Sequence, residues 1–220
     1  GLIMAWRLKD GQPEKVAEVE PAKEKTSLLD GFKVIFTTPT ACFMAVGYAA
    51  LIFVLTGYLT WMPAYMHQGF GMELKDAGFQ SMLWTHCFAA IGVLIAGRIA
   101  DKIGTKRLEW RMYMQGVGLI LAAPFLLLMG NSTELWLVCL GLAGFGFFRS
   151  LFDANTYVVM FDVIHPKYHS SSSSVLIMLG FGIGALAPYL MSKLDNLSMG
   201  ITMLGIIWIF AGVVMLVGSK

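Results

Sequence analysis

The chain has 220 residues, of which 57% are hydrophobic and only 14% are charged. A soluble domain carries about 25% charged residues, and the mean hydropathy of +0.68 is typical of a membrane protein. The sequence contains no basic module interleaved with aromatic residues, so nucleic acid is excluded as an expected partner.

The three cysteines, Cys42, Cys87 and Cys139, each lie inside an apolar run. Their spacing matches no metal-binding pattern and no disulfide framework. We interpret them as small apolar side chains, and the sequence predicts neither a metal site nor another cofactor.

The first 39 residues are predicted to precede the main membrane region. Residues 1–6 are apolar and are followed at once by Arg7 and Lys9, so we interpret them as the end of a preceding transmembrane helix in a longer protein. Residues 7–39 are predicted to form a cytoplasmic linker, solvated where Lys and Glu alternate. Within residues 27–36 apolar side chains recur at helical spacing, which predicts a short interfacial helix.

Residues 40–220 contain six stretches that are long enough to cross a bilayer, which requires about 20 mainly apolar residues. Helices are the expected structure because an open sheet cannot satisfy its edges in lipid. The expected spans are 41–65, 77–99, 113–129, 135–161, 172–190 and 199–217. The sequence therefore predicts an all-α membrane protein with six transmembrane helices.

The distribution of basic residues predicts how these helices are oriented. Six spans place both ends of the region on one side of the membrane. Of the 16 lysines and arginines, only Lys75 and Lys193 fall on the opposite side, and Arg149 lies within a span. Cytoplasmic loops are enriched in Lys and Arg, so we expect both ends to be cytoplasmic in a multi-pass protein of the plasma (inner) membrane.

Two spans carry patterns that indicate how their faces are used. In the first span Tyr58, Trp61 and Tyr65 are spaced by three and four residues and form an aromatic stripe. The stripe is consistent with a substrate platform or with an interfacial aromatic belt, and Tyr58 is the member expected to face a cavity. In the fifth span Gly180 and Gly184 form a GxxxG pair, which is typical of close helix packing.

The turn between the second and third spans is glycine-rich and strongly basic. It reads Gly-Arg-Ile-Ala-Asp-Lys-Ile-Gly-Thr-Lys-Arg from Gly97 to Arg107. Gly97 is expected to let two helices approach closely, and Gly104 to permit the sharp turn. Asp101 can pair with a cation near a helix end, while the basic residues hold the loop on the anionic cytoplasmic face.

This turn resembles the G-x-x-x-D-[RK]-x-G-x-[RK]-[RK] loop signature of the major facilitator superfamily. The matching positions are Gly97, Asp101, Lys102, Gly104, Lys106 and Arg107. The resemblance implies the C-terminal six-helix half of a twelve-helix fold, with the missing N-terminal half and the lipid bilayer as partners. It also implies that the loop latches the two halves in one conformation, although a simple positive-inside turn explains the same residues.

The fourth span carries two charged residues at membrane depth. Such charges are costly and mark functional sites. Arg149 and Asp153 are spaced i, i+4, so they share a helix face and can pair, with Asn155 adjacent. In the functional interpretation Arg149 attracts an anionic substrate and Asp153 takes a coupling proton. In the alternative, the two charges neutralise each other and fix helix packing.

A second resemblance, in the fourth span, indicates a class of substrates. Residues 146–155 look like the anion–cation symporter and spinster-like branches of the superfamily, which implies organic acids, sugar acids or lipid-derived molecules as substrates. His86, near the middle of the second span, is suited to relay protons or to form a hydrogen bond between helices.

Taken together, the sequence predicts a secondary transporter and not an enzyme. It would move a small organic anion or sugar acid by alternating access, coupled to a cation such as a proton. The residues expected to bind substrate or couple transport are Arg149, Asp153, His86, Asn155, Tyr58 and Trp61. Two alternatives stay open: a non-transporting receptor or degenerate half, and a membrane-embedded transferase that uses His86 and Asp153.

Overall fold

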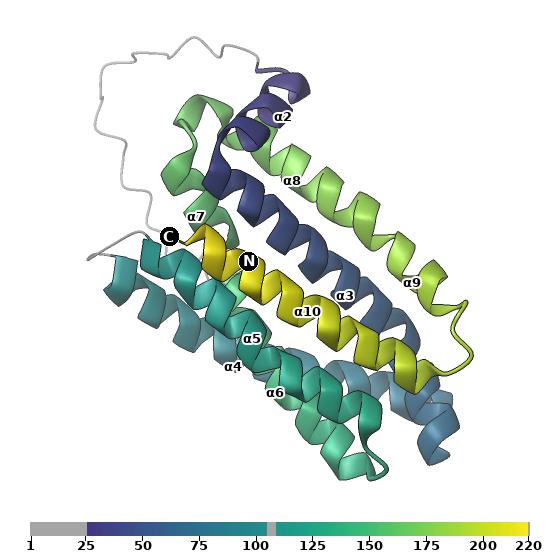
Figure 1. Ribbon diagram of the computed structural model, residues 1–220. Coiled ribbons are helices and arrows are strands. Elements are labelled where there is room, and N and C mark those ends of the chain that lie inside the picture. Colours follow the sequence, from purple (N-terminus) through teal and green to yellow (C-terminus); the bar gives the residue numbers. More distant parts are fainter. Residues whose placement is uncertain (1–25, 105–108, 220) are drawn as a thin grey trace, which may run out of the picture.

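A computed structural model describes residues 26–104 and 109–219 of the chain (Figure 1). The predictions for residues 1–6, for most of the linker, and for Lys106 and Arg107 lie outside this part. The described residues form helices and no strand. The helices are α2 Leu28–Thr37, α3 Pro39–Phe70, α4 Leu74–Gly104, α5 Glu109–Asn131, α6 Leu135–Asp153, α7 Thr156–Val163, α8 His169–Gly184, α9 Leu186–Met191 and α10 Leu197–Gly218, with the 3-10 turn η1 at Pro166–Tyr168.

The described residues contain six helical segments that are long and apolar enough to cross a membrane. This confirms the predicted fold class. The helices extend beyond the apolar spans that the sequence predicts; α4, for example, runs from Leu74 to Gly104 instead of 77–99. Polar turns can continue a helix beyond the hydrocarbon core because backbone hydrogen bonds, and not hydropathy, decide where it ends.

A short amphipathic helix, α2, precedes the bundle where the sequence predicts one. Ser27 caps it, accepting a hydrogen bond from the Leu29 amide while Asp30 accepts one from the Ser27 amide. Gly31 is buried against the start of α8, where a Cβ would come within 2.6 Å of the Ser171 carbonyl oxygen. The helix is therefore held at one end of the bundle by close backbone contact.

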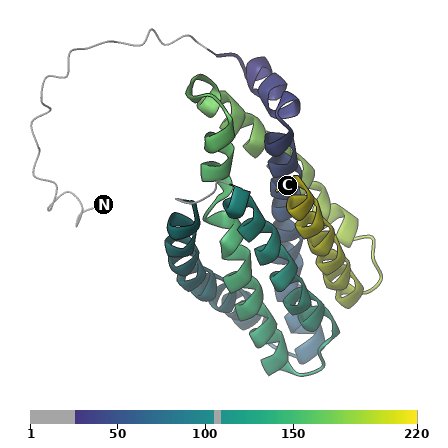
Figure 2. The same cartoon turned by 60° about the vertical axis from the view of Figure 1, so that its left-hand side comes forward.

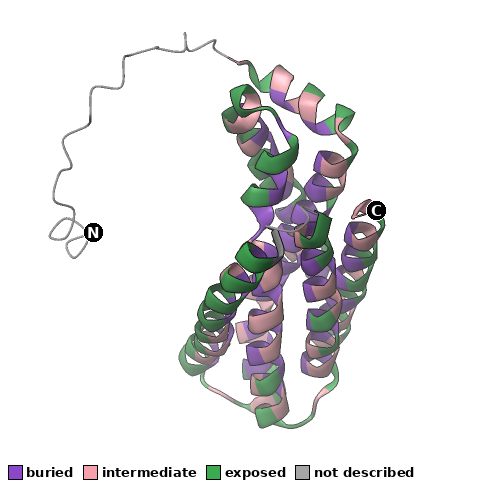
Figure 3. Ribbon diagram, turned by 90° about the vertical axis from the view of Figure 1, so that its left-hand side faces the viewer, coloured by how far each residue is buried: buried purple, intermediate pink, exposed green. Residues whose placement is uncertain are grey.

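Helix α3 lies at the centre of the arrangement and packs against α4, α8 and α10 (Figures 1 and 2). Helix α5 packs between α6 and α10, and α4 packs along α6. The core contains a chain of aromatic rings, in which Tyr58 and Phe145 have centroids 5.6 Å apart and Phe145 and Trp208 have centroids 5.2 Å apart. Buried residues gather inside the bundle, whereas exposed ones cover much of its outside (Figure 3).

The fourth and fifth spans are each divided, whereas the sequence predicts continuous helices. The fifth separates into α8 and α9 at Ala185. Pro188 lacks an amide hydrogen, so it cannot donate to the carbonyl of Gly184 four residues earlier. The Thr56 hydroxyl oxygen of α3 lies 2.7 Å from that carbonyl oxygen and can supply the missing hydrogen bond.

The predicted close packing of Gly180 and Gly184 is confirmed. A Cβ on Gly180 would lie 2.6 Å from the Tyr48 ring, and one on Gly184 would lie 2.6 Å from the Ile52 side chain. Both glycines therefore let α8 approach α3 more closely than larger residues would allow.

Candidate functional site

The candidate site is centred on the ion pair that the sequence spacing predicts. Arg149 Nη2 lies 3.3 Å from Asp153 Oδ2, and both residues belong to the last turns of α6. The Arg149 side chain is 9% exposed and that of Asp153 is 29% exposed. Arg149 Nε is buried and has no hydrogen-bond partner among the described residues. The pair is therefore neutral as a unit and keeps a guanidinium donor that a further acceptor could use.

The fourth span is interrupted directly after this pair. The Asn155 amide donates to the carbonyl oxygen of Phe152, three residues earlier, at 3.1 Å, instead of continuing the α-helical pattern to Leu151. The Asn155 side-chain amide donates to the Leu151 carbonyl oxygen at 3.0 Å. The Thr156 hydroxyl donates to the Phe152 carbonyl oxygen at 3.0 Å. The Asn155 side chain therefore satisfies the Leu151 carbonyl oxygen that the interruption releases.

Asn155 was expected to contact substrate beside the ion pair, and the structure gives it another use. It is 1% exposed, and its amide nitrogen is committed to the helix interruption. Its Oδ1 atom is buried without a hydrogen-bond partner in the described part of the chain. In this conformation Asn155 maintains the local backbone and does not present its side chain to a cavity.

Gln115 of α5 is a member of this polar cluster that the sequence analysis missed. It is fully buried, and its Nε2 atom donates to the Phe152 carbonyl oxygen at 3.2 Å. The sequence contained a signal for this buried role, because Gln115 is a polar residue inside the apolar third span. A polar side chain at such a position needs a partner within the bundle.

Two tyrosines near the pair were also missed. Tyr157 follows Asp153 by one helical turn and is 39% exposed, so Arg149, Asp153 and Tyr157 continue one face across the interruption. Tyr48 of α3 lies close enough to Tyr157 and Asp153 to interact with them electrostatically. The i, i+4, i+8 spacing of Arg149, Asp153 and Tyr157 was the available signal. Tyr48 and Tyr157 therefore belong to the polar region around the ion pair.

Tyr58, expected to face the cavity, is instead 1% exposed. Its hydroxyl donates to the Ser81 carbonyl oxygen at 2.9 Å and lies 2.5 Å from the Thr85 hydroxyl. The backbone of Thr85 in turn packs against Gly146, where a Cβ would collide with it. Tyr58 therefore joins α3 to α4 inside the core, because its hydroxyl needs a partner when buried.

The rest of the aromatic stripe has the same arrangement. Trp61 Nε1 donates to the Pro188 carbonyl oxygen of α9 at 3.1 Å, and the Tyr65 hydroxyl donates to the Met129 carbonyl oxygen of α5 at 2.9 Å. The sequence left a substrate platform and an interfacial belt open for these side chains. The structure shows that their three polar tips bond to the backbones of three neighbouring helices, and both predictions stay untested.

His86 is not brought to the ion pair. It is exposed, and its Nδ1 atom lies 3.0 Å from the Met82 carbonyl oxygen within its own helix. Among the described residues no hydrogen bond or ion pair joins His86 to Arg149 or Asp153. One residue earlier, Thr85 faces the core, so the helical turn of about 100° per residue directs His86 elsewhere.

The signature stretch is helical as far as Gly104, where α4 ends. Gly97 therefore lies inside a helix, and a Cβ there would meet no described atom within 4 Å. The expected close approach at Gly97 is thus not made within the described part of this chain. Asp101 and Lys102 are exposed at the end of α4.

No cluster of three or more potential metal ligands occurs within residues 26–104 and 109–219. The three cysteines are free. Three of the surface grooves formed by the described residues are lined by neither Arg149 nor Asp153. The ion pair is a charged element of the bundle whose Asp153 side chain is 29% exposed.

The chain is similar to a known protein family and to two curated transporters. A model of the Major Facilitator Superfamily matches residues 1–188. An MFS-type efflux pump of Mycolicibacterium smegmatis is 24% identical over 163 residues, which cover 74% of this chain and 36% of that protein. A probable L-galactonate transporter of Escherichia coli is 25% identical over 105 residues, which cover 46% of this chain and 23% of that protein.

A solved structure shares the fold. The crystal structure of a bacterial homolog to the human lysosomal transporter Spinster, in an inward-facing and unoccupied conformation, superposes with a TM-score of 0.75 at 16% sequence identity. The superposition covers 91% of this chain and 51% of that one. The chain thus spans about half the length of that structure. The matched region covers a smaller share of the two curated relatives, 36% and 23% of their lengths. The family match over most of the sequence and the six-helix architecture lead to one conclusion: the chain belongs to the Major Facilitator Superfamily.

Proposed function

We propose that the chain forms the C-terminal six-helix half of a secondary active transporter. In this proposal the complete protein moves a small organic anion or sugar acid by alternating access, coupled to a cation such as a proton. The family match and the transporters among its relatives support transport as the activity. The relatives include both an efflux pump and a probable sugar-acid transporter, so direction is left to experiment.

The observation that carries the proposed substrate class is the ion pair between Arg149 and Asp153. An unpaired charge at membrane depth is costly, so in the unloaded protein each charge stabilises the other. A guanidinium group binds carboxylates through two parallel hydrogen bonds. An anionic substrate would therefore compete with Asp153 for Arg149.

The same competition provides a means of coupling. When substrate takes Arg149, Asp153 loses its counter-charge in a region poor in water. The carboxylate then takes up a proton, because an unpaired charge there is unfavourable. Release of the substrate restores the pair and expels the proton. Tyr48 and Tyr157 would contribute hydroxyl groups to the same site.

The second six-helix unit would pack against the helices that this chain leaves uncovered. Only 22% of the apolar segment of the second span is buried and 33% of that of the fifth, compared with 56% for the first and third spans. We propose that the partner half covers α4 and α8–α9. The end of the bundle with Lys33, Arg111 and Lys167 would face the cytoplasm across the plasma membrane.

The test is uptake by the full-length protein in proteoliposomes, with L-galactonate as the first anion. Arg149→Ala should lower uptake by about 10- to 100-fold, because a hydrogen bond to a charged group is worth about 1.5–3 kcal/mol. Arg111→Ala is the matched control. Arg111 pairs with Asp162 at 2.8 Å near the basic end of the bundle, so its loss should leave uptake within about twofold, as expected for a partly exposed ion pair.

Coupling is tested separately with Asp153→Asn. This variant should still bind the anion but should lose the stimulation that a pH gradient gives to the wild type. If Arg149→Ala transports like the wild type, the proposed site is wrong. If the wild-type protein binds anions in equilibrium assays and never moves them, the receptor alternative is favoured instead.

A further inference from the structure

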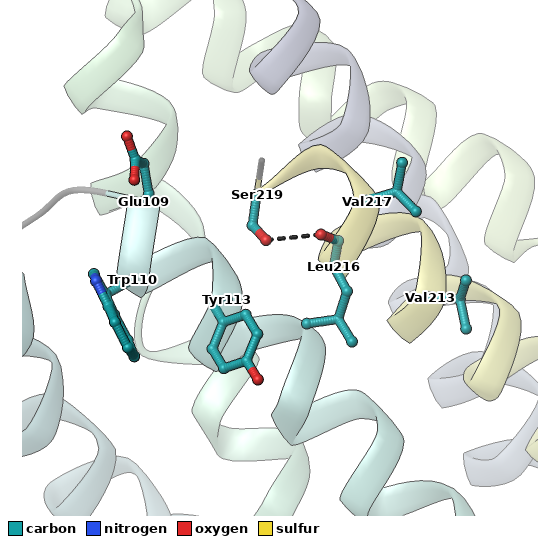
Figure 4. A pocket seen from close by; sticks show the side chains of 7 residues that line it. All are labelled: Glu109, Trp110, Tyr113, Val213, Leu216, Val217 and Ser219. Carbon is teal, nitrogen blue, oxygen red and sulfur yellow. Dashed lines mark hydrogen bonds between the residues drawn. The ribbon is translucent and has the colours of Figure 1, made fainter.

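A groove of about 650 Å³ opens between the beginning of α5 and the end of α10 (Figure 4). It lies at the basic end of the bundle, and neither Arg149 nor Asp153 lines it. The residues that line it are Glu109, Trp110, Tyr113, Val213, Leu216, Val217 and Ser219. All belong to these two helices or to the residue that follows α10, so neither α4 nor α8–α9 contributes to it.

Glycines hold the two helices together immediately beside the groove. A Cβ on Gly212 would lie 2.7 Å from the Ile120 side chain, and one on Gly116 would lie 2.8 Å from Leu216. Toward the helix ends, larger side chains replace these glycines. Leu216 packs over Gly116, and Tyr113 lies beside it on the opposite wall (Figure 4). The crossing of these two helices thus forms the groove.

The two walls differ in chemistry. The wall from α10 is aliphatic, and its Val213 and Val217 side chains are 48% and 59% exposed. The wall from α5 is aromatic, with the rings of Trp110 and Tyr113 in an edge-to-face arrangement at a centroid distance of 5.8 Å. Tryptophan and tyrosine at the ends of membrane helices lie at the level of the lipid headgroups. The groove therefore runs from the headgroup region into the hydrocarbon core.

The polar end of the groove combines one carboxylate with the partial positive charge at the start of a helix. Glu109 is the only acidic residue among those that line the groove, and its side chain is exposed. Glu109 is also the first residue of α5, whose N-terminus carries the partial positive charge of the helix dipole. A carboxylate attracts an ammonium group, and a helix N-terminus attracts a phosphate. A zwitterionic headgroup matches both.

We propose that this groove binds one phospholipid with a primary ammonium headgroup, such as phosphatidylethanolamine. An acyl chain lies between Tyr113 and the aliphatic wall formed by Val213 and Val217. The ammonium group contacts Glu109, and the phosphate lies near the start of α5 at the level of Trp110. This site is independent of the proposed transport site, because the two share no residue.

The experiment is native mass spectrometry of the full-length protein, purified in detergent and titrated with phosphatidylethanolamine or phosphatidylglycerol. The wild type should retain one phosphatidylethanolamine more firmly than phosphatidylglycerol, by about two- to fivefold, the range for an exposed ion pair. Glu109→Gln should remove this preference. Val213→Trp should fill the groove and lower retention of both lipids.

Ile206→Trp is the matched control for the filling variant. Ile206 lies on α10 two turns before Val213, is 59% exposed and does not line the groove, so its variant should retain lipid like the wild type. Val217→Trp provides a second filling variant should Val213→Trp fold poorly. Equal retention of the two lipids by the wild type, or full retention in a correctly folded filling variant, would overturn the proposal. Because lipid retention is measured without transport, failure here leaves the proposed transport function untouched.

Discussion

The fourth and fifth spans are both interrupted, but different chemistry interrupts each. In the fifth span Pro188 removes a backbone donor, and Thr56 of the neighbouring helix α3 lies where it can replace it. In the fourth span, which has no proline, the side chains of Asn155 and Thr156 bond to the carbonyl oxygens of the preceding turn. Covalent structure fixes the first interruption, whereas side-chain hydrogen bonds maintain the second.

This difference matters because the fourth-span interruption adjoins the Arg149–Asp153 pair. A helix that ends immediately after a charged pair holds that pair at its last turn, where backbone groups and polar side chains are available. Discontinuous helices in transporters supply such polar surroundings at membrane depth. The fifth-span interruption adjoins glycines and apolar contacts, so it shapes packing and not charge.

The largest effect is expected from removing the side-chain bond that maintains the fourth-span interruption. Asn155→Leu leaves the Leu151 carbonyl oxygen without the donor that lies 3.0 Å away. An unsatisfied buried polar group costs about 1–3 kcal/mol. Loss of the unpartnered Asn155 Oδ1 atom offsets part of this cost, so the free energy of unfolding of the full-length protein in mixed micelles should fall by up to that amount, and transport should decline with it.

Asn131 provides a matched control for this prediction. Its side-chain amide makes the same kind of bond, to the carbonyl oxygen of Leu127 four residues earlier, at 2.8 Å, and it also donates to the Thr202 hydroxyl of α10 at 3.1 Å. Asn131 is exposed at the end of α5, so solvent or lipid headgroups can replace the bond. Asn131→Leu should therefore change the free energy of unfolding by less than about 0.5 kcal/mol. Equal losses in the two variants would show that burial is not what makes Asn155 important.

A smaller effect is expected at the fifth span. Thr56→Val removes the hydroxyl beside the Gly184 carbonyl oxygen while keeping the shape of the side chain. Hydrogen bonds between membrane helices are worth about 0.6 kcal/mol on average and at most about 1.7 kcal/mol. The free energy of unfolding should fall by an amount in this range. Thr60→Val, which removes an exposed hydroxyl bonded within α3, should have less effect.

A double-mutant cycle isolates the contribution of the proline. Pro188→Ala restores a backbone amide that can donate to Gly184, so the Thr56 hydroxyl becomes redundant. The cost of Thr56→Val should then be clearly smaller in the Pro188→Ala background, with a coupling of about 0.5 kcal/mol or more. Strict additivity would mean that Thr56 does not compensate for the proline, and the comparison of the two interruptions would lose its basis.

The sequence allowed part of this architecture to be predicted. Hydropathy gave the six helices, and i, i+4 spacing gave the Arg149–Asp153 pair, because both depend on local periodicity. The interruption at Ala154–Asn155 could not be predicted in this way. It depends on the side chains of Asn155 and Thr156 bonding to backbone carbonyl oxygens and not to groups outside their own helix. Tertiary packing determines which of these partners each side chain meets.

The aromatic stripe shows the same limit. The spacing of Tyr58, Trp61 and Tyr65 correctly placed them on one face of α3, but it carried no information on which backbone each polar tip would meet. Their partners come from α4, α9 and α5, which are far away in sequence. Sequence periodicity predicts which residues share a helix face, whereas their hydrogen-bond partners can be identified only from the three-dimensional fold.

The smallest effect is expected from Gln115→Met, although Gln115 is fully buried beside the fourth-span interruption. The substitution removes the 3.2 Å bond to the Phe152 carbonyl oxygen, but that oxygen keeps the Asn155 amide and the Thr156 hydroxyl as donors. It also removes the buried Gln115 Oε1 atom, which has no partner among the described residues and therefore costs free energy. The two changes offset each other, so the free energy of unfolding should stay within about 0.5 kcal/mol of the wild type. A loss as large as that of Asn155→Leu would show that α5, and not the residues of the fourth span itself, maintains the interruption.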